Sequence, residues 1–377
     1  MEEPVKIKYG KEEIDACTEV LKHGEISSFR GGKEVKKFEK NFANYIGTSY
    51  AVSTTSGTTA LHAALSALDL PRGSEVGVPA LTFISTASVV LQEGLIPVFI
   101  DIDDNFCMCP LDLKKKVSEK MKAVIPVHLY GHPANMEELI ECAEMNDLVI
   151  IEDACQAHGA SISGVKVGCF GSYGCFSFYE TKNMSCGEGG MVVTNSEELY
   201  VKARFKREHG SPRNAPSWYV YDRLGFNYNM TNLQAAIGCV QLEKLESMNL
   251  ARRNKVIEYR KLLSPLGIEF SDDREGVINV CHNLPCLLPN HLKDKRDLFV
   301  ERLKSKGVPV DIAYPKPLYK TRLFEELGFE CFLPRTEDVC ERLFTLFTDE
   351  KITFDMIFKI SETIAGVLNN LEKKDFQ

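Results

Sequence analysis

Short apolar runs rich in β-branched residues alternate with helix-like stretches from about residue 50 to residue 195. This alternation is typical of strands that are joined by crossover helices and lie in one mainly parallel sheet. Helical periodicity between the runs predicts helices at 58–68 and 135–145. The predicted strands are Tyr50 to Ser53, Glu75 to Val78, Ile96 to Asp101, Ala123 to Leu129, Leu148 to Glu152, Cys175 to Tyr179 and Gly190 to Thr194.

The rest of the chain has a different pattern. A helix is predicted from Met230 to Leu250, with Thr231 as its N-cap, and it continues to about Leu262 as a bridge to a second unit. Beyond residue 265, short strands at 278–281 and 308–312 are mixed with helices at 293–306 and 353–370. For 377 residues we therefore expect the α/β class, with a large domain at 1–250 and a small α+β C-terminal domain at 251–377.

Composition narrows the class of partner. The net charge is -8, and acidic and basic residues are interleaved, so binding to a nucleic-acid backbone is disfavoured. No apolar run approaches the roughly 20 residues of a membrane span, and the first residues lack the apolar core of a signal peptide. We expect a cytoplasmic protein without a membrane segment. The thirteen cysteines lack paired C-x-x-C spacing, which favours free thiols over a zinc or other metal site.

One predicted strand ends abruptly in a carboxylate, in the segment Val149-Ile150-Ile151-Glu152-Asp153. Ligands of a parallel sheet sit outside the carboxyl ends of its strands, so Asp153 is placed to face a ligand. A loop acid that caps the next turn is an equally good interpretation of this segment alone.

Lys182 lies between a predicted buried strand, at 175–179, and the glycine-rich segment 187–190. An ordinary exposed lysine is the default for any single position. Here the aromatic and small neighbours predict partial burial, which lowers the pKa of the amine and makes it nucleophilic toward an aldehyde.

A third segment, Ser53-Thr54-Thr55-Ser56-Gly57-Thr58-Thr59, turns from a strand into a helix. Backbone N–H groups at a helix start, with hydroxyls nearby, form a phosphate site. Plain N-capping explains the same residues almost equally well. Together, however, a phosphate site, an acid and a lysine at one sheet edge match a pyridine cofactor that carries an aldehyde and a phosphate, which is pyridoxal 5'-phosphate.

Several motifs occur together and in order, and with them the chain resembles the DegT/DnrJ/EryC1/StrS family of sugar aminotransferases, which have the aspartate-aminotransferase fold (fold type I). The resemblance extends from about residue 8 to the C-terminus. The motifs are Ser-Gly-Thr-Thr-Ala-Leu at 56–61, Val-Pro-Ala-Leu-Thr-Phe at 78–83, Glu-Asp-Ala-Cys-Gln-Ala-His-Gly at 152–159, Phe-Ser-Phe-Tyr-Glu-Thr-Lys-Asn at 176–183, Gly-Glu-Gly-Gly at 187–190, Leu-Gly-Phe-Asn-Tyr-Asn-Met-Thr at 224–231 and Tyr-Pro-Lys-Pro-Leu at 314–318.

The resemblance implies a role for each matching residue. Lys182 is expected to bond the cofactor aldehyde as a Schiff base and to move the proton during transfer. Asp153 is expected to pair with the pyridine nitrogen, Gln156 to bond the ring hydroxyl and Phe83 to stack on the ring. The phosphate is assigned to Gly57, Thr58 and Ser177, and to Asn227 of the neighbouring subunit of a homodimer with shared active sites. Tyr314 and Lys316 are candidate substrate contacts.

The chain departs from the family pattern at two positions. Asn229 stands where many relatives have an arginine, so the group that binds the donor carboxylate is open; Arg223 or Lys316 are candidates, although each also fits an exposed surface cation. Glu180 stands where relatives often have a small residue, and its position alone suggests a substrate contact.

The resemblance implies transfer of an amino group from glutamate or glutamine to a nucleotide-linked keto-sugar. Relatives that remove a hydroxyl carry histidine in place of the lysine, so Lys182 favours amino transfer. The Thr-Lys-Asn and Gly-Glu-Gly-Gly pattern is similar to that of relatives acting at C4 of a 4-keto-6-deoxyhexose. Action at C3, or on a keto-cyclitol as the segment from Phe29 to Val35 suggests, is the alternative within this chemistry.

Two other classes of protein are alternatives to a sugar aminotransferase. A nicotinamide-dependent oxidoreductase needs G-x-G-x-x-G after the first strand, and residues 52–58 contain one glycine. A regulatory protein that binds the cofactor without catalysis stays open, because a fold does not define a function.

Overall fold

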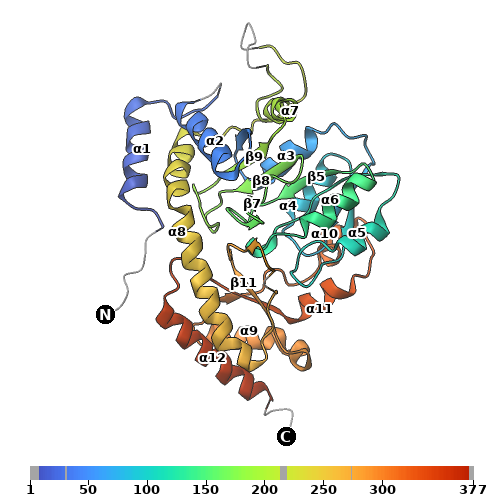
Figure 1. Ribbon diagram of the computed structural model, residues 1–377, viewed down its shortest axis with the longest axis vertical. Coiled ribbons are helices and arrows are strands. Elements are labelled where there is room, and N and C mark those ends of the chain that lie inside the picture. The colour runs from blue at the N-terminus through green and yellow to red at the C-terminus, as the bar shows by residue number, and fades with distance from the viewer. Residues whose placement is uncertain (1–7, 30–31, 213–218, 273, 373–377) are drawn as a thin grey trace.

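The computed structural model describes residues 8–29, 32–212, 219–272 and 274–372. Its centre is a seven-stranded sheet with the strand order β1-β9-β8-β5-β4-β2-β3 (Figure 1). Only β9 runs antiparallel to its two neighbours, β1 and β8, and the other pairs are parallel. The strands are β1 Tyr50–Thr54, β2 Glu75–Pro79, β3 Ile96–Ile100, β4 Met121–Val124, β5 Val149–Asp153, β8 Tyr173–Ser177 and β9 Gly190–Thr194.

Seven strands were predicted in this region, and each has a counterpart in the sheet. The prediction was wrong in extent for Ala123 to Leu129, because β4 ends at Val124. Pro126 follows and has no N–H group to continue a ladder. Its carbonyl still accepts a hydrogen bond from the backbone N–H of Asp153, at 2.9 Å. The chain after β4 therefore still runs alongside the end of β5 and helps to position Asp153, the last residue of that strand.

Helices cover both faces of the sheet, because successive residues of a strand point to opposite sides. On β5, Ile151 packs in one core and Ile150 in the other. The first layer contains α3 Gly57–Ser66, α4 Ser85–Gln92 and α7 Glu197–Arg207. The second layer contains α5 Pro110–Lys116, α6 Met136–Met145, α2 Lys33–Ile46 and the first half of α8 Asn232–Leu263.

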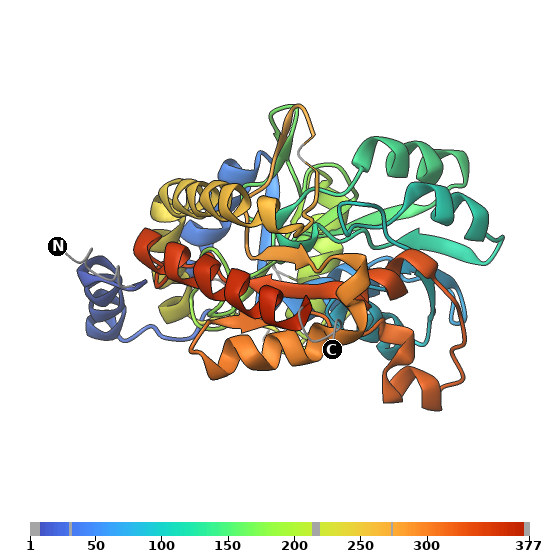
Figure 2. The same ribbon diagram turned by 90° about the horizontal axis from the view of Figure 1, so that it is seen from below.

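The C-terminal part forms a second core around the three-stranded sheet β11-β13-β12. Figure 2 shows α9 and α12 lying together beside this sheet. Its elements are β11 Leu284–Leu287, β12 Val310–Asp311, β13 Leu343–Leu346, α9 Arg296–Ser305, α11 Pro334–Arg342 and α12 Phe354–Glu372. The mixture of strands and helices agrees with the predicted α+β arrangement.

Helix α8 links the two cores and begins where the sequence indicated. Thr231 Oγ1 accepts a hydrogen bond from the Gln234 N–H, and the Gln234 side chain accepts one from the Thr231 N–H, so the helix has a capping box. Leu245 packs in the core between the large sheet and its second helix layer, and Tyr259 packs in the core of the C-terminal part. Figure 1 shows α8 running from beside α1 Lys11–His23 down to α12.

The division at residue 250 falls within α8. The segment that contains Leu318, Phe324 and Leu333 packs into the core of the large domain, although it belongs to the predicted C-terminal part. The remaining elements are short: β6 Ser161–Ile162, β7 Val165–Lys166, β10 Val277–Ile278, α10 Arg322–Glu326 and the 3-10 turns η1 Leu129–Gly131, η2 Ser264–Leu266, η3 Asn290–Lys295 and η4 Leu318–Lys320. None of the helices that the structure describes is both long and apolar enough to span a membrane.

Glu152 is a fully buried carboxylate that organises the end of the central sheet. Its two oxygens accept hydrogen bonds from three backbone N–H groups, those of Gly168, Phe170 and Gly171, each at 2.7 Å. His128 Nε2 lies 3.0 Å from the same carboxylate, and its Nδ1 accepts from the N–H of Ala134. Nε2 is therefore the protonated nitrogen, and four donors converge on one carboxylate.

We expect Glu152→Gln to lower the free energy of unfolding by about 2–3 kcal/mol. The amide has an NH2 group in place of one acceptor oxygen of the carboxylate, and this NH2 group would face N–H donors that are themselves buried. Urea unfolding monitored by circular dichroism measures the change. The matched control is Glu144→Gln on the exposed side of α6, which should lie within about 0.5 kcal/mol of wild type. Equal stability of the two variants would contradict this account of Glu152.

Candidate active site

Asp153 is the last residue of β5, and its side chain points to the opposite side of the sheet from Glu152. It is 5% exposed. Its Oδ2 accepts a hydrogen bond from Thr86 Oγ1 on α4, at 2.8 Å, and its Oδ1 accepts one from the N–H of Cys155, at 3.2 Å. A buried carboxylate held by two donors keeps a fixed direction. It can therefore present negative charge to a cationic ring nitrogen.

Lys182 lies in the turn that follows β8 and is partly buried. Burial lowers the pKa of its amine below that of an exposed lysine, although the neighbouring Cys155 and Asp153 oppose the shift. The turn is closed by a hydrogen bond from the Lys182 N–H to the carbonyl of Tyr179, at 2.9 Å. A lysine of this kind has a larger neutral fraction near neutral pH, so it can attack an aldehyde and accept a proton.

The start of α3 meets the ends of β8 and β5. A Cβ atom on Gly57 would lie 2.7 Å from Ser177 Cβ and 2.8 Å from Cys155 Sγ, so only glycine allows this approach. Thr58 Oγ1 and Ser85 Oγ, at the starts of α3 and α4, are 2.6 Å apart. Backbone N–H groups and hydroxyls thus gather at a helix N-terminus beside Ser177, which suits a phosphate.

Gln156 connects the sheet edge with the C-terminal part of the chain. Its Oε1 accepts a hydrogen bond from the N–H of Tyr130 at 2.8 Å, and its Nε2 donates one to the hydroxyl of Tyr314 at 3.1 Å. The ring of Tyr314 lies 6.4 Å from the ring of Phe83, which is 54% exposed. Phe83 therefore offers an open aromatic face next to Tyr314.

Three of the predicted site residues are exposed rather than enclosed by this chain. Glu180 and Lys316 are exposed, and the structure places neither side chain in a described hydrogen bond to the residues above. Asn227 is also exposed, and its Oδ1 accepts from Asn229 Nδ2 at 2.9 Å. Arg223, considered as a carboxylate-binding group, instead lies over the Phe205 ring and 3.9 Å from Asp69.

Four residues near the site had no role assigned to them from the sequence. Thr86 orients Asp153, and Cys155 packs against Gly57. His158 is fully buried between the rings of Phe176 and Phe178, and burial, together with the charge of Lys182, lowers its pKa to about 3. Lys8 donates a hydrogen bond to the carbonyl of Lys182, at 2.9 Å. Cys155 and His158 lie within a motif, but no sequence pattern links Thr86 or Lys8 to the site.

The cysteines do not form a metal site in the described structure. All thirteen are free, and Cys331 alone is exposed. Among the described residues no group of three or more His, Cys, Asp or Glu side chains is arranged to hold a metal ion.

The buried acid, the lysine with a lowered pKa and the close, glycine-dependent start of α3 beside Ser177 fit pyridoxal phosphate, and the fold is that of pyridoxal-phosphate-dependent enzymes of fold type I. The profile of the DegT/DnrJ/EryC1/StrS aminotransferase family matches residues 8–365. The chain belongs to this family, whose members are sugar aminotransferases that use pyridoxal phosphate. It is accordingly a pyridoxal-phosphate-dependent aminotransferase, and the nicotinamide alternative is excluded.

The relatives have related but different substrates. UDP-N-acetyl-3-dehydro-alpha-D-glucosamine 3-aminotransferase of Acidithiobacillus ferrooxidans is 36% identical over 91% of this chain and 91% of that protein. GDP-perosamine synthase of Escherichia coli O157:H7 is 37% identical over 79% of this chain and 83% of that protein. The crystal structure of S. venezuelae DesV in complex with a ketimine intermediate has a TM-score of 0.88 and 32% identity, and covers 95% of this chain and 94% of that chain.

The lowered pKa of Lys182 has a consequence for the cofactor-free protein. The unfolded chain holds this proton up to a pH of about 10.5, whereas the folded chain releases it at a lower pH. The unfolded state thus binds more protons in this window, and stability rises with pH through it. We expect Lys182→Met to raise the melting temperature of the apoprotein near pH 7, and this advantage to shrink as the pH approaches 10.

Calorimetric melting of the apoproteins between pH 7 and pH 10 measures this difference. Lys120→Met, at an exposed position, serves as the control and should show no such trend. A constant difference between Lys182→Met and wild type across the range would contradict a lowered pKa.

Proposed function

We propose that this aminotransferase moves an amino group from glutamate or glutamine to a nucleotide-linked keto-sugar, at C4 of a 4-keto-6-deoxyhexose. The observation that carries the proposal is a partly buried Lys182 of lowered pKa within electrostatic range of the buried carboxylate of Asp153. The nucleotide-linked substrate is supported by the UDP- and GDP-linked sugars in the names of the two relatives.

The position of amination is argued from sequence. The Thr181-Lys182-Asn183 and Gly187-Glu188-Gly189-Gly190 segments are similar to those of relatives that act at C4. Amination at C3 is the second candidate, and the 36% identity to a 3-aminotransferase favours it. The segment that suggested a keto-cyclitol includes Arg30 and Gly31, which lie outside the described residues.

Each site residue has a proposed task. Pyridoxal phosphate supplies an aldehyde and an electron-withdrawing ring. Asp153 holds the proton on the ring nitrogen, because its buried charge favours a cation next to it. Gln156 bonds the ring hydroxyl, Phe83 covers the ring face, and Gly57, Thr58 and Ser177 bind the phosphate.

Lys182 acts twice, as the amine that bonds the cofactor and as the base and acid that moves the proton at the reacting carbon. Its lowered pKa suits both tasks, since a neutral amine is the nucleophile and the proton acceptor. Tyr314 sits next to Phe83 and is proposed to line the sugar site. Lys316 and Glu180, which are exposed, are proposed to contact the substrate at the entrance of the sugar site. Lys316 is proposed to bind the carboxylate of the amino donor.

The working enzyme is proposed to be a homodimer. Asn227, assigned to the phosphate, is exposed within one chain, which is consistent with a contact to a cofactor held by the neighbouring subunit. Exposed apolar side chains lie in the same loop, with Tyr219 83% and Leu224 88% exposed. Apolar exposure of this extent is typical of a surface that is covered in an assembly.

Incubation of the purified protein with pyridoxal phosphate, glutamate or glutamine, and UDP-, dTDP- or GDP-linked 3-keto and 4-keto sugars tests the reaction. We expect an amino sugar from a 4-keto substrate, detected by mass spectrometry, and at least a thousandfold slower turnover for Lys182→Ala, because nucleophile and base are lost together. Lys120→Ala is the matched control and should keep the wild-type rate. Product from 3-keto sugars alone would favour the second candidate.

A protein that binds pyridoxal phosphate through Lys182 but aminates none of these sugars would support the regulatory alternative. Full turnover by Lys182→Ala would refute the assignment of the lysine.

Subunit mixing tests the shared site. Lys182→Ala and Asn227→Ala homodimers are each expected to be impaired, whereas a hybrid of the two contains one site with both residues intact. Equal mixing after dissociation should therefore restore about a quarter of the wild-type rate, since half of the dimers are hybrids and each has one good site. The rate of the mixture would equal the mean of the two variants if Asn227 served its own chain.

A further inference from the structure

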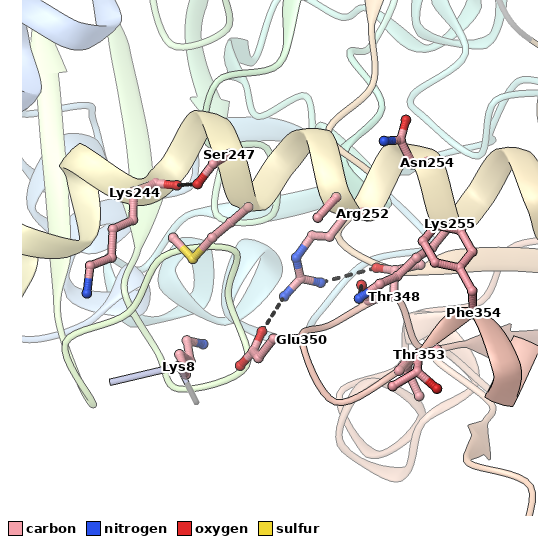
Figure 3. A pocket seen from close by; sticks show the side chains of 13 residues that line it. Lys8, Lys244, Ser247, Arg252, Asn254, Lys255, Thr348, Glu350, Thr353 and Phe354 are labelled. Carbon is pink, nitrogen blue, oxygen red and sulfur yellow. Dashed lines mark hydrogen bonds and ion pairs between the residues drawn. The ribbon is translucent and has the colours of Figure 1, made fainter. Parts of the chain in front are cut away.

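A cavity of about 470 Å³ lies on the side of α8 that faces the C-terminal part of the chain. Its walls are α8, from Lys244 to Lys255, the segment from Thr348 to Phe354 that leads into α12, and Lys8 near the N-terminus. Figure 3 shows Arg252 reaching from α8 toward Thr348 and Glu350, with Lys8 nearby. The volume lies within the range of small-molecule sites, which is roughly 300–1,000 Å³.

Cationic side chains outnumber carboxylates in the lining of this cavity. Four cationic side chains, Lys8, Lys244, Arg252 and Lys255, line it together with a single carboxylate, Glu350. The whole chain has a net charge of -8, so a cationic cavity is a local exception. Charges of one sign in a concave site concentrate the potential there and attract ions of the opposite sign.

Two of these cations have a carboxylate partner, and the other contacts of Arg252 are with neutral groups. Lys244 pairs with Glu13 at 2.8 Å and is compensated. Arg252, which is 3% exposed, donates to the His282 carbonyl at 3.0 Å and to Thr348 Oγ1 at 3.1 Å, and it forms an ion pair with Glu350, the one carboxylate that lines the cavity, at 3.7 Å. A carbonyl or hydroxyl satisfies a donor without adding a negative charge.

Lys8 has the same kind of environment. It donates to the backbone carbonyls of Glu180 and Lys182. Burial lowers the pKa of Lys8 to about 8 and the charge of Arg252 lowers it as well, whereas Glu350, Glu180 and Asp349 oppose the shift. Burial also lowers the pKa of Arg252. Both cations therefore lie where additional negative charge would stabilise them.

We propose that this cavity is a binding site, separate from the cofactor site, for a small organic anion. Its phosphate or carboxylate group lies between Lys8 and Arg252, and its apolar part rests on Met248, Ile352 and Phe354. The anion supplies the charge that the carbonyl partners of these cations lack. Lys8 also donates a hydrogen bond to the Lys182 carbonyl. The same side chain would therefore contact both the ligand in the cavity and the turn that contains Lys182.

Isothermal titration of the enzyme loaded with pyridoxal phosphate tests the site, since the cofactor then occupies its own phosphate-binding residues. Phenyl phosphate and benzoate are the probes and separate the two anionic groups, while benzyl alcohol has the same ring without charge. We expect phenyl phosphate to bind most tightly and benzyl alcohol not to bind.

Four variants locate the binding. Lys8→Met should weaken phenyl phosphate binding about tenfold and Glu350→Gln should tighten it about threefold, because they remove opposite charges from one cavity. Lys261→Met, an exposed lysine elsewhere on α8, should leave the affinity unchanged. Ser247→Trp fills the cavity without changing its charge and should abolish binding even if Lys8→Met folds poorly.

The outcomes distinguish this site from the cofactor and substrate sites. Opposite shifts for Lys8→Met and Glu350→Gln support the cavity. Absence of binding at millimolar probe, or an affinity that none of the cavity variants changes, overturns the proposal.

Discussion

Two carboxylates in succession end the central strand, and neither can be buried without donors. Strand geometry sends them to opposite sides of the sheet. Glu152 accepts hydrogen bonds from His128 and from three backbone N–H groups, which tie the segment 168–171 to the end of β5. Asp153 receives a hydrogen bond from Thr86 and faces the site. Glu152 stabilises the carboxyl end of β5. Asp153 lies at this rigid end, so its carboxylate keeps a fixed direction.

The site is assembled around this edge from segments that are far apart in the chain. Gly57 brings the start of α3 against Ser177, while Gln156 bonds Tyr314 from the C-terminal part. The N-terminal segment contacts the turn that contains Lys182, because Lys8 donates to the Lys182 carbonyl and the Tyr9 hydroxyl donates to Ser185 Oγ at 2.9 Å. Positioning of the lysine therefore depends on contacts across more than 170 residues.

Local patterns predicted much of the fold. The alternation of apolar runs indicated the strands of the sheet, and the Thr231 capping box marked the start of α8. The predicted strand bounds were wrong where local patterns are weak. The strand predicted at 123–129 ends at Val124, because Pro126 has no N–H group to continue the hydrogen-bond ladder of the sheet. The strand predicted at 308–312 is only Val310–Asp311, because few of its residues find a partner strand.

By itself the sequence determined the fold class and the family, and it supplied the motifs whose residues are proposed to hold the cofactor, because these depend on periodicity and on short segments whose chemistry is local. Only the tertiary structure decided that Thr86 holds Asp153, that Lys8 holds the Lys182 turn, and that Lys8 lines one cavity together with three cations of α8. Such contacts join residues without any sequence spacing in common. They exist because packing brings separate elements together, and buried polar groups must then find partners among whichever residues are near.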